Sequence, residues 1–235
     1  MAAAAMMRVS FDLGLLLDRW PRSAFASHRF PAIGCASSSD ELNKIGRLRY
    51  DLFIERDGKA YSGANHRQRS FLELIDGHSL NFQVVHHGEP IAAVRLTRAK
   101  DALADEHLVR IVEHAGLNHS DLRQTVVNSR LAVRPDTRAR LQIPLLFRHM
   151  YRIGVLSGAA YCLVAARPDV GPLFEKFGFK KRSVSYVDPV GGLMEVHVLD
   201  VFDKAALLGG FDDVLAEMES SGELPLAAVT ENANA

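Results

Sequence analysis

Three arginines follow a predicted strand and surround the expected start of a helix. Residues 128–150, NSRLAVRPDTRARLQIPLLFRHM, are predicted to end a strand, turn, and continue as an amphipathic helix. The turn contains Arg134, Arg138 and Arg140. A helix N-terminus has free backbone N–H groups and the positive end of the helix dipole, which suit an anion. The sequence therefore predicts a site here for a phosphate-bearing carrier, the alternative being a solvated basic turn.

A second group of residues could transfer protons. Glu73, Asp76 and His78 lie in the segment FLELIDGHSLNF, just before a predicted strand. Either carboxylate could act as a general base, and histidine is a rival because this residue type works near neutral pH. The competing interpretation is that Glu73 caps a turn or is solvated and that Asp76-Gly77 is simply a turn dipeptide.

Two further arginines could hold an anionic substrate. Arg49 and Arg95 could bind the carboxylate of an amino acid by bidentate contacts. They could instead form structural ion pairs with Glu55, Glu73 or Asp76. Aromatic residues could line a tunnel for an acyl chain, although aromatic residues at such spacing are usually core. These are Phe53, Phe71, Phe82, Phe147, Phe174 and Phe177.

The composition favours one globular domain. The chain has 235 residues, of which 28 are basic, 28 are acidic and 48% are hydrophobic. A balanced charge argues against general nucleic-acid binding, for which a basic domain is expected. Cys35 and Cys162 are far apart and show no zinc or disulfide spacing. We expect Cys162 to be a buried thiol, the site to use no metal, and the protein to be cytoplasmic.

The chain is predicted to have three parts. Residues 1–27 form a partly helical or mobile extension, whose short apolar patch is interrupted by Asp12 and fits a signal peptide poorly. Residues 28–201 form the main domain, and residues 202–235 form a helix and a disordered tail. No segment has the run of about 20 apolar residues that a membrane span needs.

The elements that must position these residues follow from periodicity, capping and turn signals. Ser38 and Glu41 make a capping-box pattern at the start of one helix, and Pro144 predicts an irregular start to another. Residues 56–69 are predicted to form a long loop, and residues 86–90 are predicted to form a hairpin turn. Helices are expected at 38–55, 101–116, 137–156, 172–177 and 202–219. Strands are expected at 30–35, 80–85, 91–97, 126–133, 161–166, 182–187 and 193–199. This order predicts an α/β (α+β) fold with a mixed sheet.

Two motifs resemble the GNAT N-acyltransferase superfamily over roughly residues 30–200. They are LAVRPDTRARL, with Val133, Pro135 and Arg138 in a V-x-P-x-x-R pattern, and PLFEKFGFK after a later strand. The resemblance implies a GNAT fold, with a mostly antiparallel sheet flanked by helices. It also implies that Arg134, Arg138 and Arg140 bind the phosphate of the acyl donor.

The chain departs from the common GNAT pattern at three positions. Leu141 and Ile143 stand where the arginine loop usually has glycines that let the backbone approach a pyrophosphate closely. Phe174 stands where many GNAT enzymes have a tyrosine general acid, and phenylalanine cannot donate a proton. These departures favour a donor other than ordinary coenzyme A.

The segments LRYDLFIE, AVRL and NSRLAV are similar to LuxI-type autoinducer synthases and FeeM-type N-acyl amino acid synthases. Arg49, Phe53, Arg95 and Arg130 match the recurrent residues of that subgroup. Asn128 replaces the glutamate of the autoinducer synthases, whose tryptophan after the first helix is also missing. Both differences favour N-acylation of an amino acid over synthesis of a homoserine lactone.

The resemblance therefore implies an N-acyltransferase that moves a fatty acyl group from the phosphopantetheine of acyl carrier protein to an amino acid amine. The implied catalytic residues are Glu73, Asp76, His78 and Arg130. The implied substrate-binding residues are Arg49, Phe53, Arg95, Asn128, Leu131 and Val133. The alternatives are a GNAT enzyme that uses acyl- or acetyl-coenzyme A, a homoserine lactone synthase, and a non-catalytic module that binds a lipid or the carrier protein.

Overall fold

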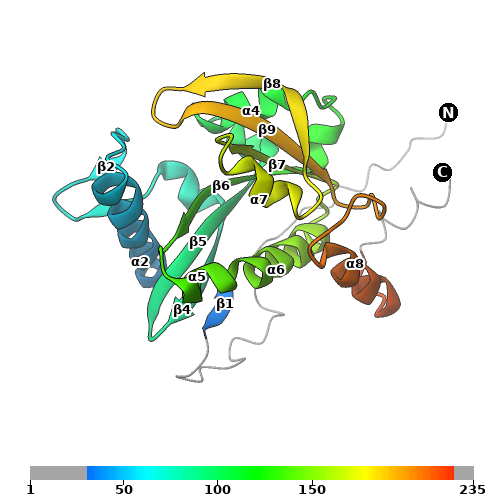
Figure 1. The fold of residues 1–235 in the computed structure, drawn as a ribbon, viewed down its shortest axis with the longest axis horizontal. Coiled ribbons are helices and arrows are strands. Elements are labelled where there is room, and N and C mark those ends of the chain that lie inside the picture. Colours follow the sequence, from blue (N-terminus) through cyan, green and yellow to red (C-terminus); the bar gives the residue numbers. More distant parts are fainter. Residues whose placement is uncertain (1–30, 225–235) are drawn as a thin grey trace, which may run out of the picture.

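The computed structural model describes residues 31–224, and the predicted N-terminal extension and residues 225–235 of the tail lie outside this range (Figure 1). Its centre is a seven-stranded sheet in the order β1-β4-β5-β6-β7-β9-β8. The strands are β1 (Ala32–Cys35), β4 (Leu80–His86), β5 (Glu89–Arg98), β6 (Thr125–Val133), β7 (Tyr161–Ala166), β8 (Lys180–Asp188) and β9 (Gly192–Asp200). Only β6 and β7 pair in parallel, which confirms the predicted mixed, mostly antiparallel sheet.

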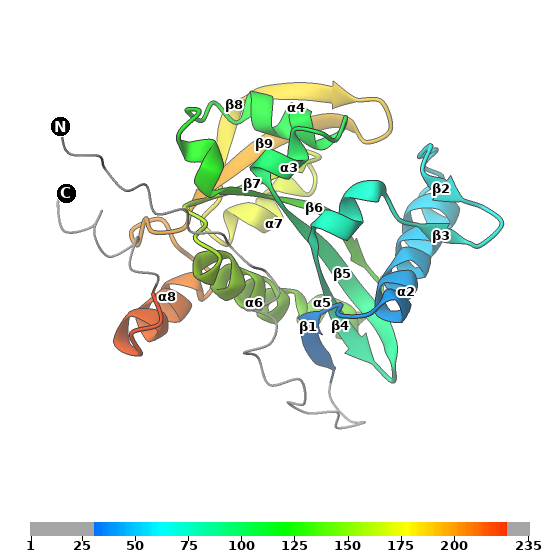
Figure 2. The same cartoon turned by 180° about the vertical axis from the view of Figure 1, so that it is seen from behind.

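Helices cover both faces of the sheet (Figures 1 and 2). The first face packs against α6 (Ile143–Leu156), α7 (Gly171–Glu175) and α8 (Phe211–Ser220). The second face packs against α2 (Ser39–Arg49) and the π-helix η1 (Tyr50–Arg56) at one end and against α3 (Ala99–Ala102) and α4 (Leu108–His114) at the other. The remaining short elements are α5 (Thr137–Leu141), η2 (Leu74–His78), η3 (Asp121–Gln124) and a two-stranded sheet of β2 (Ala64–Asn65) and β3 (Ser70–Phe71).

Local signals in the sequence set several of these boundaries. The Ser38 side chain accepts a hydrogen bond from the backbone N–H of Glu41, whose carboxylate accepts one from the backbone N–H of Ser38. This confirms the predicted capping box. The turn between β4 and β5 has positive φ at His87 and Gly88, as a tight hairpin turn requires. Pro144 lies in the first turn of α6, and the helix is broken at Gln142 between α5 and α6.

Three predicted elements differ from the structure. The long loop 56–69 contains β2, which pairs with β3. The helix expected at 101–116 is two short helices, α3 and α4, separated by a turn. The helix expected from residue 202 begins only at Phe211, because Gly209 and Gly210 both have positive φ, a backbone conformation that a right-handed helix cannot include.

Candidate active site

The two central parallel strands separate part of the way along their length. β6 and β7 pair from Thr125 and Tyr161 as far as Asn128 and Val164. Beyond that point β6 pairs only with β5, and the end of β7 pairs only with β9. The facing backbone edges of β6 and β7 therefore lack strand partners there, and an extended ligand can pair with such an edge.

A β-bulge lies where the strands begin to separate. The register between β5 and β6 shifts between the pairs Ala93–Ala132 and Arg95–Ser129. Within this shift Arg130 has φ of 56°, a value that non-glycine residues rarely adopt. Bulges re-aim side chains and are frequent beside active sites. Here the Arg130 side chain reaches Glu73 on the second face of the sheet.

Glu73 joins two of the predicted arginines. Its Oε2 accepts hydrogen bonds from Nε of Arg130 at 2.7 Å and from Nη1 of Arg95 at 2.8 Å, and its Oε1 accepts one from Nη2 of Arg130. The Arg95 Nε donates to the Ser129 hydroxyl at 3.0 Å. Two charged hydrogen bonds to one guanidinium fix its orientation as well as its position.

Asp76 holds the third arginine of this network. The Arg49 Nη1 donates to Oδ1 of Asp76 at 2.8 Å, and its Nη2 donates to Oδ1 of Asn81 at 2.8 Å. Asp76 also accepts the backbone N–H of Glu73, which ties the two carboxylates together. Arg49 and Arg95 are both 0% exposed. Their observed contacts are ion pairs with Asp76 and Glu73, which is the alternative interpretation of these two arginines.

The ion pairs keep Glu73 charged. Burial opposes ionisation of this carboxyl, but the hydrogen bonds and charges of Arg130 and Arg95 outweigh burial and lower its pKa from 4.5 to about 2. The same carboxylate raises the pKa of Arg130 against the opposing effect of burial. A carboxylate with so low a pKa is a weak proton acceptor at neutral pH. Asp76 is 3% exposed, whereas His78 is exposed at the end of η2 and outside this network.

The predicted donor-binding arginines do not converge on one point. Arg134 is half-buried and lies 3.8 Å from Oδ2 of Asp51 in η1. Arg138 is exposed, and its Nη1 lies 2.9 Å from a ring nitrogen of His86 at the end of β4. Arg140 is exposed on α5. Asp136 caps α5 by accepting the Ala139 backbone N–H, so one donor of this helix start is already occupied.

The three departures from the GNAT pattern have structural counterparts. Leu141 is 68% exposed at the end of α5, and Ile143 is buried in the core beneath the arginine turn. Phe174 is buried in α7, with its ring stacked on Phe147 at 5.8 Å between centroids. Phe174 therefore acts as a core residue rather than facing the opening between β6 and β7.

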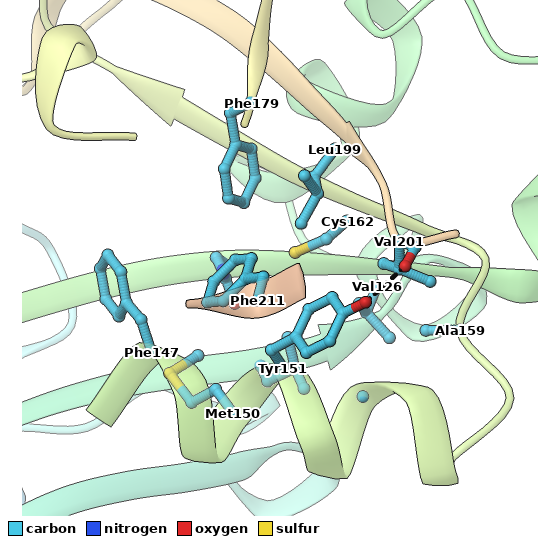
Figure 3. Close-up of a pocket in the computed structure, with 13 residues that line it drawn as sticks. Val126, Phe147, Met150, Tyr151, Ala159, Cys162, Phe179, Leu199, Val201 and Phe211 are labelled. Atoms are coloured by element: carbon cyan, nitrogen blue, oxygen red, sulfur yellow. Dashed lines mark hydrogen bonds between the residues drawn. The ribbon is translucent and has the colours of Figure 1, made fainter. Parts of the chain in front are cut away.

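An apolar cavity of about 30 Å³ lies on the first face of the sheet, beneath the paired part of β6 and β7 (Figure 3). Its walls come from strands β6, β7 and β9 and from helices α6 and α8. Tyr151 donates a hydrogen bond to the backbone carbonyl of Val201 and stacks on Phe211, which closes one side. The lining includes Val126, Asn128, Phe147, Met150, Tyr151, Gly154, Cys162, Phe179, Leu199 and Phe211.

Asn128 connects this cavity to the separated strands. It belongs to the last pair that β6 forms with β7, and its side chain also lines the cavity. Its Oδ1 is buried and has no hydrogen-bond partner among residues 31–224. Buried polar atoms are nearly always satisfied, so an unpaired one in the wall of a cavity points to a partner supplied by a ligand.

Most of the predicted aromatic residues belong to the core rather than to a tunnel. Among the six phenylalanines, Phe147 lines the cavity, and Phe53 and Phe71 pack with Tyr61 on the second face. Leu131 and Val133 are half-buried on β6 and pack against the first-face core. Cys162 is buried as predicted, and burial raises the pKa of its thiol to about 12.

Four residues beside Arg130 had no predicted role. Lys59 and Tyr61 come from the loop after η1, His107 precedes α4, and Asp188 ends β8. The Tyr61 ring lies 4.5 Å from the Arg130 guanidinium. The only sequence signal for any of them was the length of the loop at 56–69. No three potential metal ligands gather within residues 31–224.

A comparison with protein families identifies the family of this chain. The model for the N-acyl amino acid synthase FeeM matches residues 44–189, more than half of the chain. The chain belongs to the FeeM family. It is therefore an acyltransferase, as predicted, and the match spans the network, the bulge, the arginine turn and most of the cavity wall.

Several solved structures share the fold of this chain. A coenzyme A-dependent acyl-homoserine lactone synthase, BjaI, has a TM-score of 0.62 and 16% identity, covering 80% of this chain and 88% of its own. FeeM from uncultured soil microbes has a TM-score of 0.60 and 10% identity, covering 76% and 94%. ElaA of Escherichia coli has a TM-score of 0.51 and 14% identity, covering 72% and 99%.

Because the identities are low, these similarities are evidence for the fold alone. They confirm the predicted GNAT fold. A comparison with curated proteins gave no match. None of the helices between residues 31 and 224 is long and apolar enough to cross a bilayer.

Proposed function

We propose that this protein transfers a fatty acyl group from the phosphopantetheine thioester of acyl carrier protein to the amine of an amino acid, in the cytoplasm. One observation carries the proposal. Asn128, in the last β6–β7 pair before the strands separate, lines the apolar cavity on one face of the sheet, and Arg130, two residues further along β6, joins Glu73 in the charged network on the other face. An apolar acyl chain and a zwitterionic acceptor can therefore approach the same reaction centre from opposite faces.

The donor arm lies between the separated strands in this proposal. Its amides pair with the free edge of β6, as an added strand would. The thioester lies beside Asn128, and the acyl chain enters the cavity. A chain longer than a few carbons requires lining side chains to move, and Met150 is suited to this because methionine is flexible. Backbone N–H groups at the bulge are the candidates for stabilising the oxyanion.

Acyl carrier protein is the proposed donor because of the arginine turn. Arg138 and Arg140 are exposed on a chain with no net charge, so they form a local basic surface that would attract an acidic carrier protein. Phosphopantetheine carries one phosphate and no nucleotide, so the close backbone approach that glycine permits is dispensable. Bulky Leu141 and Ile143 are compatible with that simpler donor.

The contacts suggest new roles for the network residues. We assign Glu73, Asp76, Arg49 and Arg95 to positioning, because all four are held in mutual ion pairs. Arg130, which lies in the bulge of β6 and is held by Glu73, is assigned to orienting the acceptor. Lys59 is a half-buried ammonium whose pKa is lowered, mainly by burial, and no carboxylate lies within 4 Å of it among residues 31–224. Lys59, whose charge interacts with those of Arg130 and Asp188, is therefore the cation that we assign to the carboxylate of the acceptor.

The reaction can be tested directly. Purified protein is incubated with palmitoyl carrier protein or palmitoyl coenzyme A and a mixture of amino acids, and N-acyl products are sought by mass spectrometry. We expect N-acyl amino acids with the carrier-protein donor. Absence of product with both donors would refute the proposed reaction, and product with coenzyme A alone would refute the carrier-protein part.

Replacing Arg138 with alanine is expected to raise the KM for acyl carrier protein about 10–100-fold and to leave kcat nearly unchanged. Each charge-assisted contact contributes about 1.5–3 kcal/mol, and a docking contact acts equally on the ground state and the transition state. Steady-state kinetics with varied carrier protein measures this. Arg123→Ala, at an exposed arginine of η3, is the matched control. An unchanged KM in Arg138→Ala would contradict the docking role.

A further inference from the structure

A histidine and an aspartate meet beside the charged network. His107 is the residue before α4, and Asp188 ends β8; Figure 2 shows α4 beside the hairpin of β8 and β9. The Nδ1 of His107 lies 3.4 Å from Oδ2 of Asp188. The His107 ring meets the Tyr61 ring edge-on, with centroids 6.2 Å apart, and Tyr61 in turn covers the Arg130 guanidinium. This contact series links the pair to the bulge on β6.

The Asp188 carboxylate is fixed in its orientation. Its Oδ1 accepts the backbone N–H of Val190 at 2.9 Å and that of Gly191 at 2.6 Å, which leaves Oδ2 to face His107. Burial opposes ionisation of Asp188, but these two N–H groups and His107 hold its pKa below the usual range. An ionised oxygen can only accept a hydrogen bond, so Nδ1 of His107 carries the hydrogen.

The other ring nitrogen is consequently a hydrogen-bond acceptor. Nε2 of His107 lies 3.6 Å from Oε1 of Glu106, which is beyond hydrogen-bonding distance, and the Glu106 side chain is 81% exposed. No hydrogen bond occupies Nε2 among the residues that the structure describes. The His107 side chain is 22% exposed, so a small ligand on the second face can reach it.

We propose that His107 is the general base that deprotonates the acceptor amine and that Asp188 is its positioning residue. This inference rests on the proposed acyl transfer. Glu73 is poorly suited to be the base because it is held by two arginines, so His107 takes that role. Histidine is the side chain most often used for this role, and a carboxylate on Nδ1 sets the required tautomer.

Two protons leave the acceptor nitrogen in the proposed step. Nε2 of His107 takes one proton from the acceptor ammonium, and the neutral nitrogen then forms a C–N bond to the thioester carbonyl carbon. The second proton leaves that nitrogen to solvent. The C–S bond breaks with its electron pair on sulfur, and the thiolate is protonated by the histidinium or by solvent.

Other charged groups surround His107. Asp105 and Glu106 lie on its own segment, and the Asp105 carboxylate accepts the His107 backbone N–H at 3.0 Å. Asp188 approaches from β8, Tyr61 from the loop after η1, and Arg130 from β6. Three carboxylates, the Arg130 guanidinium and the Lys59 ammonium, whose charge interacts with that of Asp188, therefore lie around the proposed base.

The first test replaces His107 with glutamine in the full chain, with an amino acid acceptor found in the product assay. At pH 7 we expect kcat/KM for the acceptor to fall by about 10²–10⁴-fold. We expect an unchanged KM for the donor and an unchanged thermal unfolding midpoint. Between pH 7 and 9.5 the deficit should shrink, because more of the acceptor amine is already deprotonated. His119→Gln, at an exposed histidine following α4, is the matched control.

The second test replaces Asp188 with asparagine, whose side-chain oxygen can still accept the N–H groups of Val190 and Gly191. We expect a loss of roughly tenfold or more, because the tautomer of His107 is no longer fixed. If the wild type is active, two results would overturn the role of His107 alone. One is a kcat/KM of His107→Gln within about threefold of wild type, and the other is a deficit in kcat/KM that stays constant with pH. An inactive wild type would overturn the acyl-transfer proposal as well.

Discussion

Replacing Glu73 with glutamine is expected to lower the free energy of unfolding by about 3–5 kcal/mol, because Arg130 and Arg95 would lose their shared anionic partner in a buried site. The thermal midpoint should fall by roughly 10 °C for a chain of this size. We also expect kcat/KM to fall by roughly 10²-fold, since Arg130 would no longer be held in one orientation. Urea unfolding and steady-state kinetics measure the two effects.

An exposed ion pair is the control for this variant. Glu55 pairs with Arg69 outside the core, and its side chain is 40% exposed. Glu55→Gln should change stability by no more than about 1 kcal/mol, as is usual for surface pairs. If Glu73→Gln and Glu55→Gln were equally mild, the buried network would not be what holds η2 to the sheet.

The same variant makes the pH dependence of stability testable. The pKa of Glu73 is about 2 in the folded protein and 4.5 ordinarily, so its stabilising contribution is full above pH 4.5 and is lost as pH falls through 2. The wild type should therefore approach Glu73→Gln in stability as the solution is acidified from pH 5 toward pH 2. A stability gap that is constant over this range would contradict the ion-pair assignment.

Replacing Gly154 with alanine is expected to separate stability from activity. Gly154 is a buried residue of α6 that lines the apolar cavity, and a Cβ added there would meet nothing within 4 Å. Alanine should stabilise the helix by roughly 0.5–1 kcal/mol. The added methyl group would occupy space that the acyl chain needs.

The activity cost should depend on chain length. One methyl group in an apolar pocket changes discrimination by about 10–200-fold, so the longest accepted chains should lose most and the shortest least. Rates with a series of acyl donors measure this. Gly34→Ala, on the edge strand β1 with open space around its Cβ, is the matched control. A uniform loss across all chain lengths would show that the acyl chain does not enter this cavity.

The elements that the sequence predicted well are those fixed by neighbouring residues. The capping box of Ser38 and Glu41 spans four residues, the β4–β5 turn depends on His87 and Gly88, and the break before α6 depends on Pro144. Each of these signals acts within a few residues, so it is readable without the fold. The prediction of a long helix from residue 202 was wrong because it relied on the spacing of apolar residues and gave too little weight to the adjacent pair Gly209-Gly210.

The sequence also identified most of the residues in the network, with two interpretations left open. Arg49, Glu73, Asp76, Arg95 and Arg130 were all singled out as substrate or proton-transfer groups, and ion pairs of Arg49 and Arg95 with Glu55, Glu73 or Asp76 were the alternative. Their contacts with one another join residues up to 57 positions apart, and these contacts make Glu73 a weak base. A pKa depends on burial and on charges in space, and neither is written in a local motif.

What the sequence by itself determined is the family, the fold and the set of charged residues, because periodicity, capping and short motifs are local properties. Only the tertiary structure decided where β6 and β7 separate, that Asn128 lines a cavity, and that His107 meets Asp188 beside Tyr61. These three features arise from strand register and from loops that meet across the sheet. Residues 61, 107 and 188 share no spacing that links them, so their proximity is a consequence of the folded chain alone.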